Sequence, residues 1–184
     1  MTGPTLETPR LILRPPIQAD LDGWAAFCAD EETMRFIGGV VSRPVAWRIM
    51  STVAGYWQLQ GFGMFSVIEK ATGRWIGRLG PIHPEAWPGD EVGWGLAREA
   101  WGKGYATEGA AAAMDYAVDV LGWPDIIHTI APENLASAAL ARRLGSTNRG
   151  PGALPEPFEN QPVDIWGQTA DEWRANRRQF RPEV

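Results

Sequence analysis

Residues 91–109, EVGWGLAREAWGKGYATEG, contain the pattern that decides the fold of this sequence. An apolar run ends in a loop (101–106, the glycine loop) with three small residues, Gly102, Gly104 and Ala106, and the helix-forming stretch ATEGAAAAMDYAVDV follows at once. Small residues in a loop let its backbone approach another group closely. The helix behind it directs N–H groups toward whatever lies there. The stretch therefore predicts a strand, a glycine loop and a helix N-terminus suited to an anion.

Two well-known nucleotide-binding loops do not match these residues. A Walker loop needs glycine where Ala97 stands and a hydroxyl where Gly104 stands. The dinucleotide fingerprint needs a third glycine where Thr107 stands. Two interpretations stay open from the residues alone. The backbone of residues 102–107 binds a pyrophosphate whose charge Lys103 partly neutralises, or the glycines serve only a tight strand-to-helix turn.

The length, charge and composition of the chain exclude several classes of protein. The 184 residues suit a single domain over 1–184, and the formal charge of −5 argues against a nucleic-acid binder. Cys28 is the only cysteine, and His83 and His128 have no companions at metal spacing, so no disulfide or metal site is expected. The opening MTGPTLETPR has no apolar signal segment and no stretch reaches membrane-spanning length, so a soluble, cytoplasmic protein is expected.

Periodicity and turn signals predict an alternation of strands and helices. Prolines and glycines mark 150–162 as a loop, and the helix at 44–60 is expected to bury Trp47, Met50, Ala54 and Trp57. Strands are expected at 10–16, 61–69, 74–82, 91–97, 125–131 and 163–169, and helices at 18–30, 44–60, 105–121, 134–144 and around Trp173. This order predicts a mixed-sheet α/β domain.

Two separated segments carry a family resemblance. EVGWGL…WGKGYATE, followed by APENLASAALARRLG (131–145), resembles the GNAT superfamily of acyl-CoA N-acetyltransferases and, within it, the RimJ/RimL-type branch. PRLILRP (9–15), WIGRLGPI (75–82) and VDIWGQT extend the resemblance over nearly the whole chain. It implies a twisted, mostly antiparallel mixed sheet (α+β), flanked by helices and splayed open to hold acetyl-CoA. Trp101 departs from the family's general phosphate-loop pattern, though not from this branch.

The resemblance also implies which residues bind the co-substrate. Backbone around Leu96 would pair with the pantetheine arm, and an N–H there would support the developing oxyanion. Asn134 would cap its helix and touch acetyl-CoA. No metal takes part. The phosphate-binding residues implied are Gly102, Lys103, Gly104, Tyr105, Ala106 and Thr107.

Acetyl transfer needs a base for the amine, whose pKa is about 10, and a proton for the departing thiolate, whose thiol has a pKa of about 8.5. Glu91, which opens the strand before the loop, is the expected base, with Asp90 and Glu85 in reserve; the alternative for Glu91 is a solvated carboxylate. Many family members use a tyrosine as the acid, but Ala141 stands in its place. The branch carries a serine where Ser137 stands, although N-x-x-S at a helix start is also good capping chemistry.

These expectations describe an acetyl-CoA-dependent N-acetyltransferase that acts on a primary amine, either a protein N-terminus or a small amine, by direct transfer in a ternary complex. The rival is a non-catalytic acyl-CoA-binding or sensing module that kept the fold. Several tryptophans fall in the region that forms the acceptor side of the cleft in this family, although core packing is the commoner fate of tryptophan. An apolar, tryptophan-rich surface would also suit a homodimer. The tryptophans concerned are Trp24, Trp47, Trp57 and Trp87.

Overall fold

The computed structural model describes residues 3–180; residues 1–2 and 181–184 of the expected domain lie outside this range. The chain forms two compact units. The first combines residues 3–80 with Trp94–Gly109, and the second combines Pro81–Gly93 with residues 110–180. The strands are β1 (Leu6–Glu7), β2 (Leu11–Arg14), β3 (Phe65–Glu69), β4 (Trp75–Ile82), β5 (Glu91–Leu96), β6 (Asp125–Ile130), β7 (Thr147–Gly152) and β8 (Val163–Thr169). The helices are α1 (Leu21–Ala29), α2 (Glu31–Met34), α3 (Arg43–Leu59), α4 (Tyr105–Asp119), α5 (Leu135–Arg143) and α6 (Ala170–Asn176), with 3-10 turns η1 (Gln18–Asp20), η2 (Arg98–Ala100) and η3 (Arg177–Phe180).

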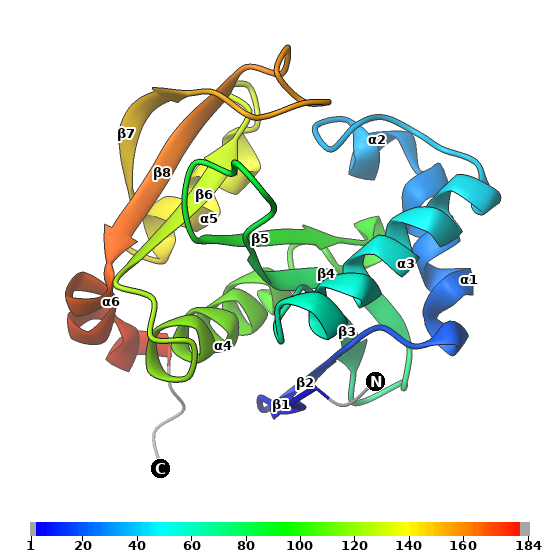
Figure 1. The fold of residues 1–184 in the computed structure, drawn as a ribbon. Coiled ribbons are helices and arrows are strands. Elements are labelled where there is room, and N and C mark those ends of the chain that lie inside the picture. Colours follow the sequence, from blue (N-terminus) through cyan, green and yellow to red (C-terminus); the bar gives the residue numbers. More distant parts are fainter. Residues whose placement is uncertain (1–2, 181–184) are drawn as a thin grey trace. The chain divides into compact units, whose positions relative to one another are not determined.

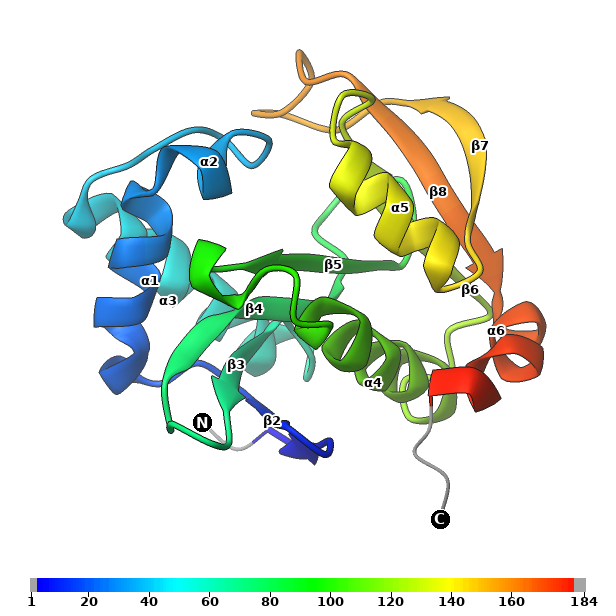
Figure 2. The same ribbon diagram turned by 180° about the vertical axis from the view of Figure 1, so that it is seen from behind.

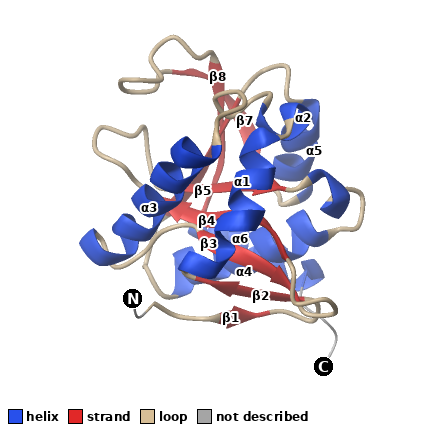
Figure 3. Ribbon diagram, turned by 90° about the vertical axis from the view of Figure 1, so that its right-hand side faces the viewer, coloured by secondary structure: helices blue, strands red, loops and turns tan. Residues whose placement is uncertain are grey.

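The strands form a mixed sheet in the order β1-β2-β3-β4-β5-β6-β8-β7. In the first unit, β1 to β4 follow one another in the sheet as they do in the chain (Figure 3). β2 is antiparallel to β1 and β3, and β3 to β4, while β8 is antiparallel to β6 and β7. β5 pairs with β6 in parallel, with Glu91 opposite Ile127. This open, mostly antiparallel sheet flanked by helices confirms the predicted fold class.

The first unit buries its apolar side chains between strands and helices. α1 packs on α3 (Figure 1), and Trp24 of α1 is fully buried. Trp57 of α3 lies against Phe65 of β3, with ring centroids 4.9 Å apart. The expected stripe on α3 is wrong at Trp47, which is 47% exposed. The buried side chains of this helix are those of Ala46, Met50, Val53 and Trp57.

The second unit places α5 against β6 and β8 (Figure 2). β6 is buried on both faces, because the consecutive residues Ile126 and Ile127 are both buried, as is Ile130. Trp173 of α6 is fully buried, and its indole N–H donates to Asp115 at 3.0 Å. Gly145 ends α5 with φ +97°, the left-handed conformation that glycine adopts freely.

Three elements were not expected from the sequence. β1 and α2 span only two and four residues, too few to give a periodic pattern. β7 has the sequence TNRGPG, which resembles a loop, and its pairing with β8 shifts between Asn148 and Pro151. Proline is tolerated in a strand at an edge or a bulge, and β7 ends the strand order. The expected loop therefore begins only after Gly152.

Candidate active site

In the first unit, the glycine loop joins η2 to α4. Gly102 has φ +72° and Gly104 has φ +79°, so both residues use the left-handed conformation that other residues avoid. A Cβ at Gly102 would meet nothing within 4 Å, whereas one at Gly104 would lie 3.3 Å from Nη2 of Arg10. The loop thus needs glycine for its backbone angles, and it is open on the side of Gly102.

Helix α4 starts directly after this loop. Its hydrogen-bond ladder begins with the N–H of Glu108, which donates to the carbonyl of Gly104 at 3.1 Å. The glycine loop therefore leads directly into the first turn of α4, at the positive end of the helix. The structure brings the predicted phosphate-binding residues together at one helix N-terminus, which is the geometry that favours an anion.

Contacts from the first strands hold this loop in place. Oε1 of Glu108 accepts from the Thr8 hydroxyl at 2.6 Å and from the Arg10 backbone N–H at 2.8 Å. Oε2 accepts from Nε of Arg10 at 2.6 Å. Burial raises the pKa of Glu108, but these hydrogen bonds outweigh it and hold the pKa below its usual value. Glu108 thus anchors α4 to the segment that joins β1 and β2.

Tyr105 and Lys103 complete the surroundings of the loop. The Tyr105 hydroxyl donates to Glu69 at 2.6 Å, a contact that raises the pKa of the phenol. The guanidinium of Arg10 lies over the Tyr105 ring, 4.5 Å from its centroid. The carbonyl of Lys103 accepts from Nη1 of Arg10 at 2.8 Å, while the Lys103 side chain is exposed. No pattern in the sequence pointed to Arg10, because its partners lie far along the chain.

Leu96, the last residue of β5, has a contact that its expected role did not include. Its carbonyl accepts from the indole N–H of Trp101 at 2.7 Å. The next amide, that of Ala97, donates to Ile76 at 2.9 Å. Trp101 therefore ties the glycine loop to the strand end, which gives a physical role to the residue that departs from the general pattern.

In the second unit, Glu91 is buried rather than solvated. The residue is 5% exposed, and its Oε2 accepts from the Trp87 indole at 2.6 Å and from the Thr129 hydroxyl at 2.9 Å. The interpretation of Glu91 as a solvated carboxylate is therefore wrong. Oδ1 of Asp90 lies 2.6 Å from Nδ1 of His83, and Glu85 is exposed.

Asn134 and Ser137 form the start of α5. The side-chain oxygen of Asn134 accepts from the backbone N–H of Ser137 at 3.1 Å, so Asn134 is the N-cap of this helix. Both residues are half-buried. The amide of Ser137 is therefore the donor to this cap. Ala141, at the place of the family's tyrosine, is fully buried.

His128 is a buried polar residue of the second unit. Its Nδ1 lies 2.7 Å from the carbonyl of Val92 and its Nε2 lies 3.0 Å from the Ser146 hydroxyl. Gln168 donates to the same hydroxyl at 2.9 Å. Because a carbonyl only accepts, the ring carries its proton on Nδ1. Burial lowers the pKa of His128 from 6.5 to about 4. His128 is therefore a packing residue of β6, with hydrogen bonds on both ring nitrogens.

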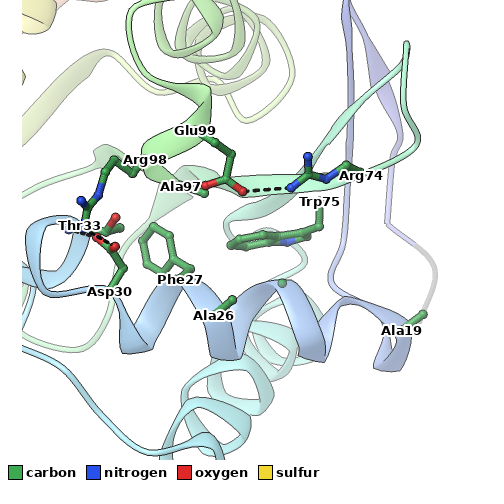
Figure 4. Close-up of a pocket in the computed structure, with 11 residues that line it drawn as sticks. Ala19, Ala26, Phe27, Asp30, Thr33, Arg74, Trp75, Ala97, Arg98 and Glu99 are labelled. Carbon is green, nitrogen blue, oxygen red and sulfur yellow. Dashed lines mark hydrogen bonds and ion pairs between the residues drawn. The ribbon is translucent and has the colours of Figure 1, made fainter.

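A separate cavity lies within the first unit (Figure 4). It has a volume of about 360 Å³ and is lined by the aromatic rings of Phe27 and Trp75. Two ion pairs border it, Asp30 with Arg98 at 2.5 Å and Arg74 with Glu99 at 3.1 Å. None of the predicted site residues lines this cavity.

Within residues 3–180, no three His, Cys, Asp or Glu side chains are grouped so as to hold a metal ion. None of the helices described there combines the length and hydrophobicity needed to cross a membrane.

Comparison with known proteins decides the family. The family described as Acetyltransferase (GNAT) domain matches residues 10–147. The chain belongs to the GNAT acetyltransferase family. All the predicted site residues of this acyltransferase, from Glu91 to Ser137, lie inside the matched segment.

Individual relatives agree with the GNAT assignment. The Uncharacterized N-acetyltransferase p20 of Bacillus licheniformis is 31% identical over 165 residues, which cover 88% of this chain and 93% of p20. The crystal structure of the acetyltransferase from Agrobacterium tumefaciens str. C58 is 31% identical with a TM-score of 0.78, covering 91% of this chain and 95% of that one. Mycobacterium smegmatis RimJ in complex with CoA-disulfide shares the fold, with a TM-score of 0.74, 20% identity and coverage of 92% and 87%.

Proposed function

We propose that this GNAT acetyltransferase moves an acetyl group from acetyl-CoA to a primary amine by direct transfer in a ternary complex. The amine nitrogen attacks the thioester carbonyl carbon, a C–N bond forms and the C–S bond breaks with its electron pair leaving on sulfur. The ammonium must first lose a proton to a base, and the thiolate is stabilised by receiving one. The base and the acid are the protein's contribution, together with the placement of both substrates.

The glycine loop is the observation that carries the proposal. Two positive-φ glycines, an open side at Gly102 and a following helix N-terminus suit the pyrophosphate of acetyl-CoA. Arg10 and Lys103 add positive charge at the loop. The N–H groups of residues 102–107 would bind the phosphates. In this proposal, the strand backbone around Leu96 binds the pantetheine arm and supports the oxyanion, and Asn134 also contacts acetyl-CoA.

Glu91 is proposed as the base. Its Oε2 accepts from the Trp87 indole and from the Thr129 hydroxyl. These contacts fix the orientation of the carboxylate, which suits a group that must accept a proton at a defined place. Asp90 and Glu85 remain the reserves.

Ser137 is proposed to deliver a proton to the departing thiolate and to recover one from solvent. The hydrogen bond from its backbone amide to Asn134 places Ser137 at the start of α5. Direct transfer is favoured because Cys28 is buried in the core of the first unit, with 1% exposure, and burial raises the pKa of its thiol. A protonated, buried thiol is a poor nucleophile.

The acceptor is proposed to be a cationic primary amine, either a protein N-terminus or a small amine. The chain's formal charge of −5 favours the approach of cations. The sequence WGKGYAT and the position of Ser137 support the RimJ/RimL-type branch. We also propose one acetyltransferase domain for the two units, because β4, β5 and α4 each run continuously across their boundaries.

Thiol release from acetyl-CoA, measured over a panel of amines and peptides with free N-termini, tests the proposal. We expect release with at least one cationic amine, and a decrease in kcat of about 100-fold in Glu91→Gln with CoA affinity unchanged. Cys28→Ala should keep wild-type turnover. Loss of turnover in Cys28→Ala would argue for a covalent intermediate, and CoA binding without thiol release from any amine would favour a sensing module.

A further inference from the structure

Arg10 contacts the Lys103–Gly104 peptide of the glycine loop. The conformational freedom of glycine allows this peptide two opposite orientations. Nη1 of Arg10 donates to the carbonyl of Lys103 at 2.8 Å, and its Nη2 lies 3.3 Å from the position that a Cβ of Gly104 would take. The same peptide unit contains the N–H of Gly104. In a planar trans peptide, the C=O and the N–H point in opposite directions. A donor that holds the carbonyl therefore also sets the direction of the Gly104 N–H.

Glycine alone would not hold this orientation. A flip of the Lys103–Gly104 peptide changes the sign of φ at Gly104, and glycine populates both signs about equally. In the structure φ at Gly104 is +79°, so the carbonyl points toward Arg10 and the N–H points away from it. A flipped peptide would present a carbonyl oxygen, rather than an N–H, to an anion in the loop.

Arg10 is itself held from three sides. Its Nε donates to Glu108 at 2.6 Å, its backbone N–H donates to the same carboxylate at 2.8 Å, and its guanidinium covers the Tyr105 ring. The Tyr105 hydroxyl is in turn bound to Glu69. The guanidinium is planar and its donors have a fixed geometry, so anchoring Nε also places Nη1.

We propose that Arg10 is a positioning residue that fixes the Lys103–Gly104 peptide so that the Gly104 N–H faces the pyrophosphate of the donor. This inference rests on the proposed function of the glycine loop. Arg10 acts through the peptide and not as the phosphate ligand, because its Nε and Nη1 are already engaged by Glu108 and by Lys103.

The experiment compares two donors, acetyl-CoA and S-acetylpantetheine, which lacks the phosphates. Arg10→Ala should raise KM for acetyl-CoA about tenfold at similar kcat and leave kcat/KM for S-acetylpantetheine unchanged. Arg10→Lys should not restore the wild-type KM, because an ammonium cannot hold Glu108 and the Lys103 carbonyl with fixed geometry. Arg43→Ala, which removes an arginine paired with Asp22 in the same unit, is the matched control and should behave as wild type.

Glu108→Gln separates positioning from simple charge attraction. If Arg10 bound phosphate directly, removing the negative charge of Glu108 would strengthen acetyl-CoA binding. The positioning role predicts weaker binding, because Nε of Arg10 loses its charged anchor. Tighter binding in Glu108→Gln, or an unchanged KM in Arg10→Ala, would overturn the inference. A wild-type enzyme that did not prefer acetyl-CoA to S-acetylpantetheine would instead overturn the proposed role of the loop itself.

Discussion

At the residue scale, Gly102 and Gly104 adopt a backbone conformation that a branched residue can hardly reach, and they do so beside the N-terminus of α4. Such angles serve a tight turn as well as an anion-binding loop. The two roles differ in what a substitution changes. A turn residue affects stability, whereas a phosphate-binding residue affects the affinity for CoA.

Gly104→Val should weaken CoA binding at least tenfold, about 1.4 kcal/mol, as measured by titration calorimetry. Valine forces the left-handed backbone to rearrange, and its Cβ would come within 3.3 Å of Arg10. Lys103→Ala should have a smaller effect, because it removes one exposed charge and no backbone donor. Gly73→Val is the matched control, since Gly73 has φ +68° and open surroundings in the β3–β4 turn. Wild-type CoA binding by Gly104→Val, or an equal loss in Gly73→Val, would show that the loop is only a turn.

His128 links the stability of the second unit to pH. Its pKa of about 4 in the folded protein lies below the value of 6.5 expected when unfolded, so the unfolded state binds the proton more readily. The contribution of His128 to the free energy of unfolding is therefore complete above pH 6.5 and is lost as the pH falls toward 4. Arg149 lowers this pKa further, while Asp125 and the hydrogen bond to Val92 partly oppose the shift.

We expect the free energy of unfolding to fall by up to about 3 kcal/mol between pH 6.5 and pH 4, on top of any loss from carboxyl groups. His128→Asn, which retains a donor toward Val92, should be less stable at pH 7 and should lose less stability over this range. Urea unfolding at several pH values makes the comparison. If the His128→Asn variant reproduced the wild-type pH dependence in full, His128 would be excluded as its source.

The residue types at the site were predictable, but their surroundings were not. Glu91 was expected to be the base because it starts a strand. Its hydrogen bonds with Trp87 and Thr129 were not predicted, and Thr129 lies far along the chain. The position of Glu108 in the first turn of a helix gives no hint of its contacts with Thr8 and Arg10. Single-residue patterns carry no information about such long-range partners.

At the element scale, the start of α5 holds two residues with different proposed roles: Asn134 caps the helix, and Ser137 is proposed to deliver a proton. Asn134 accepts a hydrogen bond from the backbone amide of Ser137, so the side chain of Asn134 is the N-cap of this helix. The two residues, three positions apart, can therefore be tested against each other on the same helix.

Asn134→Ala should lower the free energy of unfolding by about 1 kcal/mol, because an N-cap is lost. Ser137→Ala should leave stability within about 0.5 kcal/mol and CoA affinity nearly unchanged, while turnover decreases. Thermal unfolding, calorimetry and thiol release measure the three quantities. Unchanged turnover in Ser137→Ala would remove the hydroxyl from the mechanism.

Elements with a clear period were predicted close to their observed bounds. The β3–β4 hairpin, α3, α4 and α5 follow from apolar spacing and from proline and glycine at their ends. The face of α3 was predicted less well, because Trp47 is large and apolar but exposed. β7 was missed because its pairing with β8 determines its conformation, and no local pattern records that pairing.

At the scale of the whole molecule, the fold class followed from the order of elements and from the family resemblance. The resemblance also supplied the donor, because one loop and one helix start are enough to mark acetyl-CoA chemistry. The acceptor has no such signature in the sequence. The expected homodimer also stays a prediction, which sedimentation of the full chain would test.

Acetyl balance tests the central claim most directly. The full chain is incubated with acetyl-CoA and an accepted cationic amine, and free CoA thiol is compared with acetylated amine identified by mass spectrometry. We predict one acetylated amine for each thiol released, no release beyond hydrolysis without amine, and no acetyl group on the protein itself. Thiol release without acetylated amine, or a protein-bound acetyl group that disappears when amine is added, would contradict direct transfer to an amine.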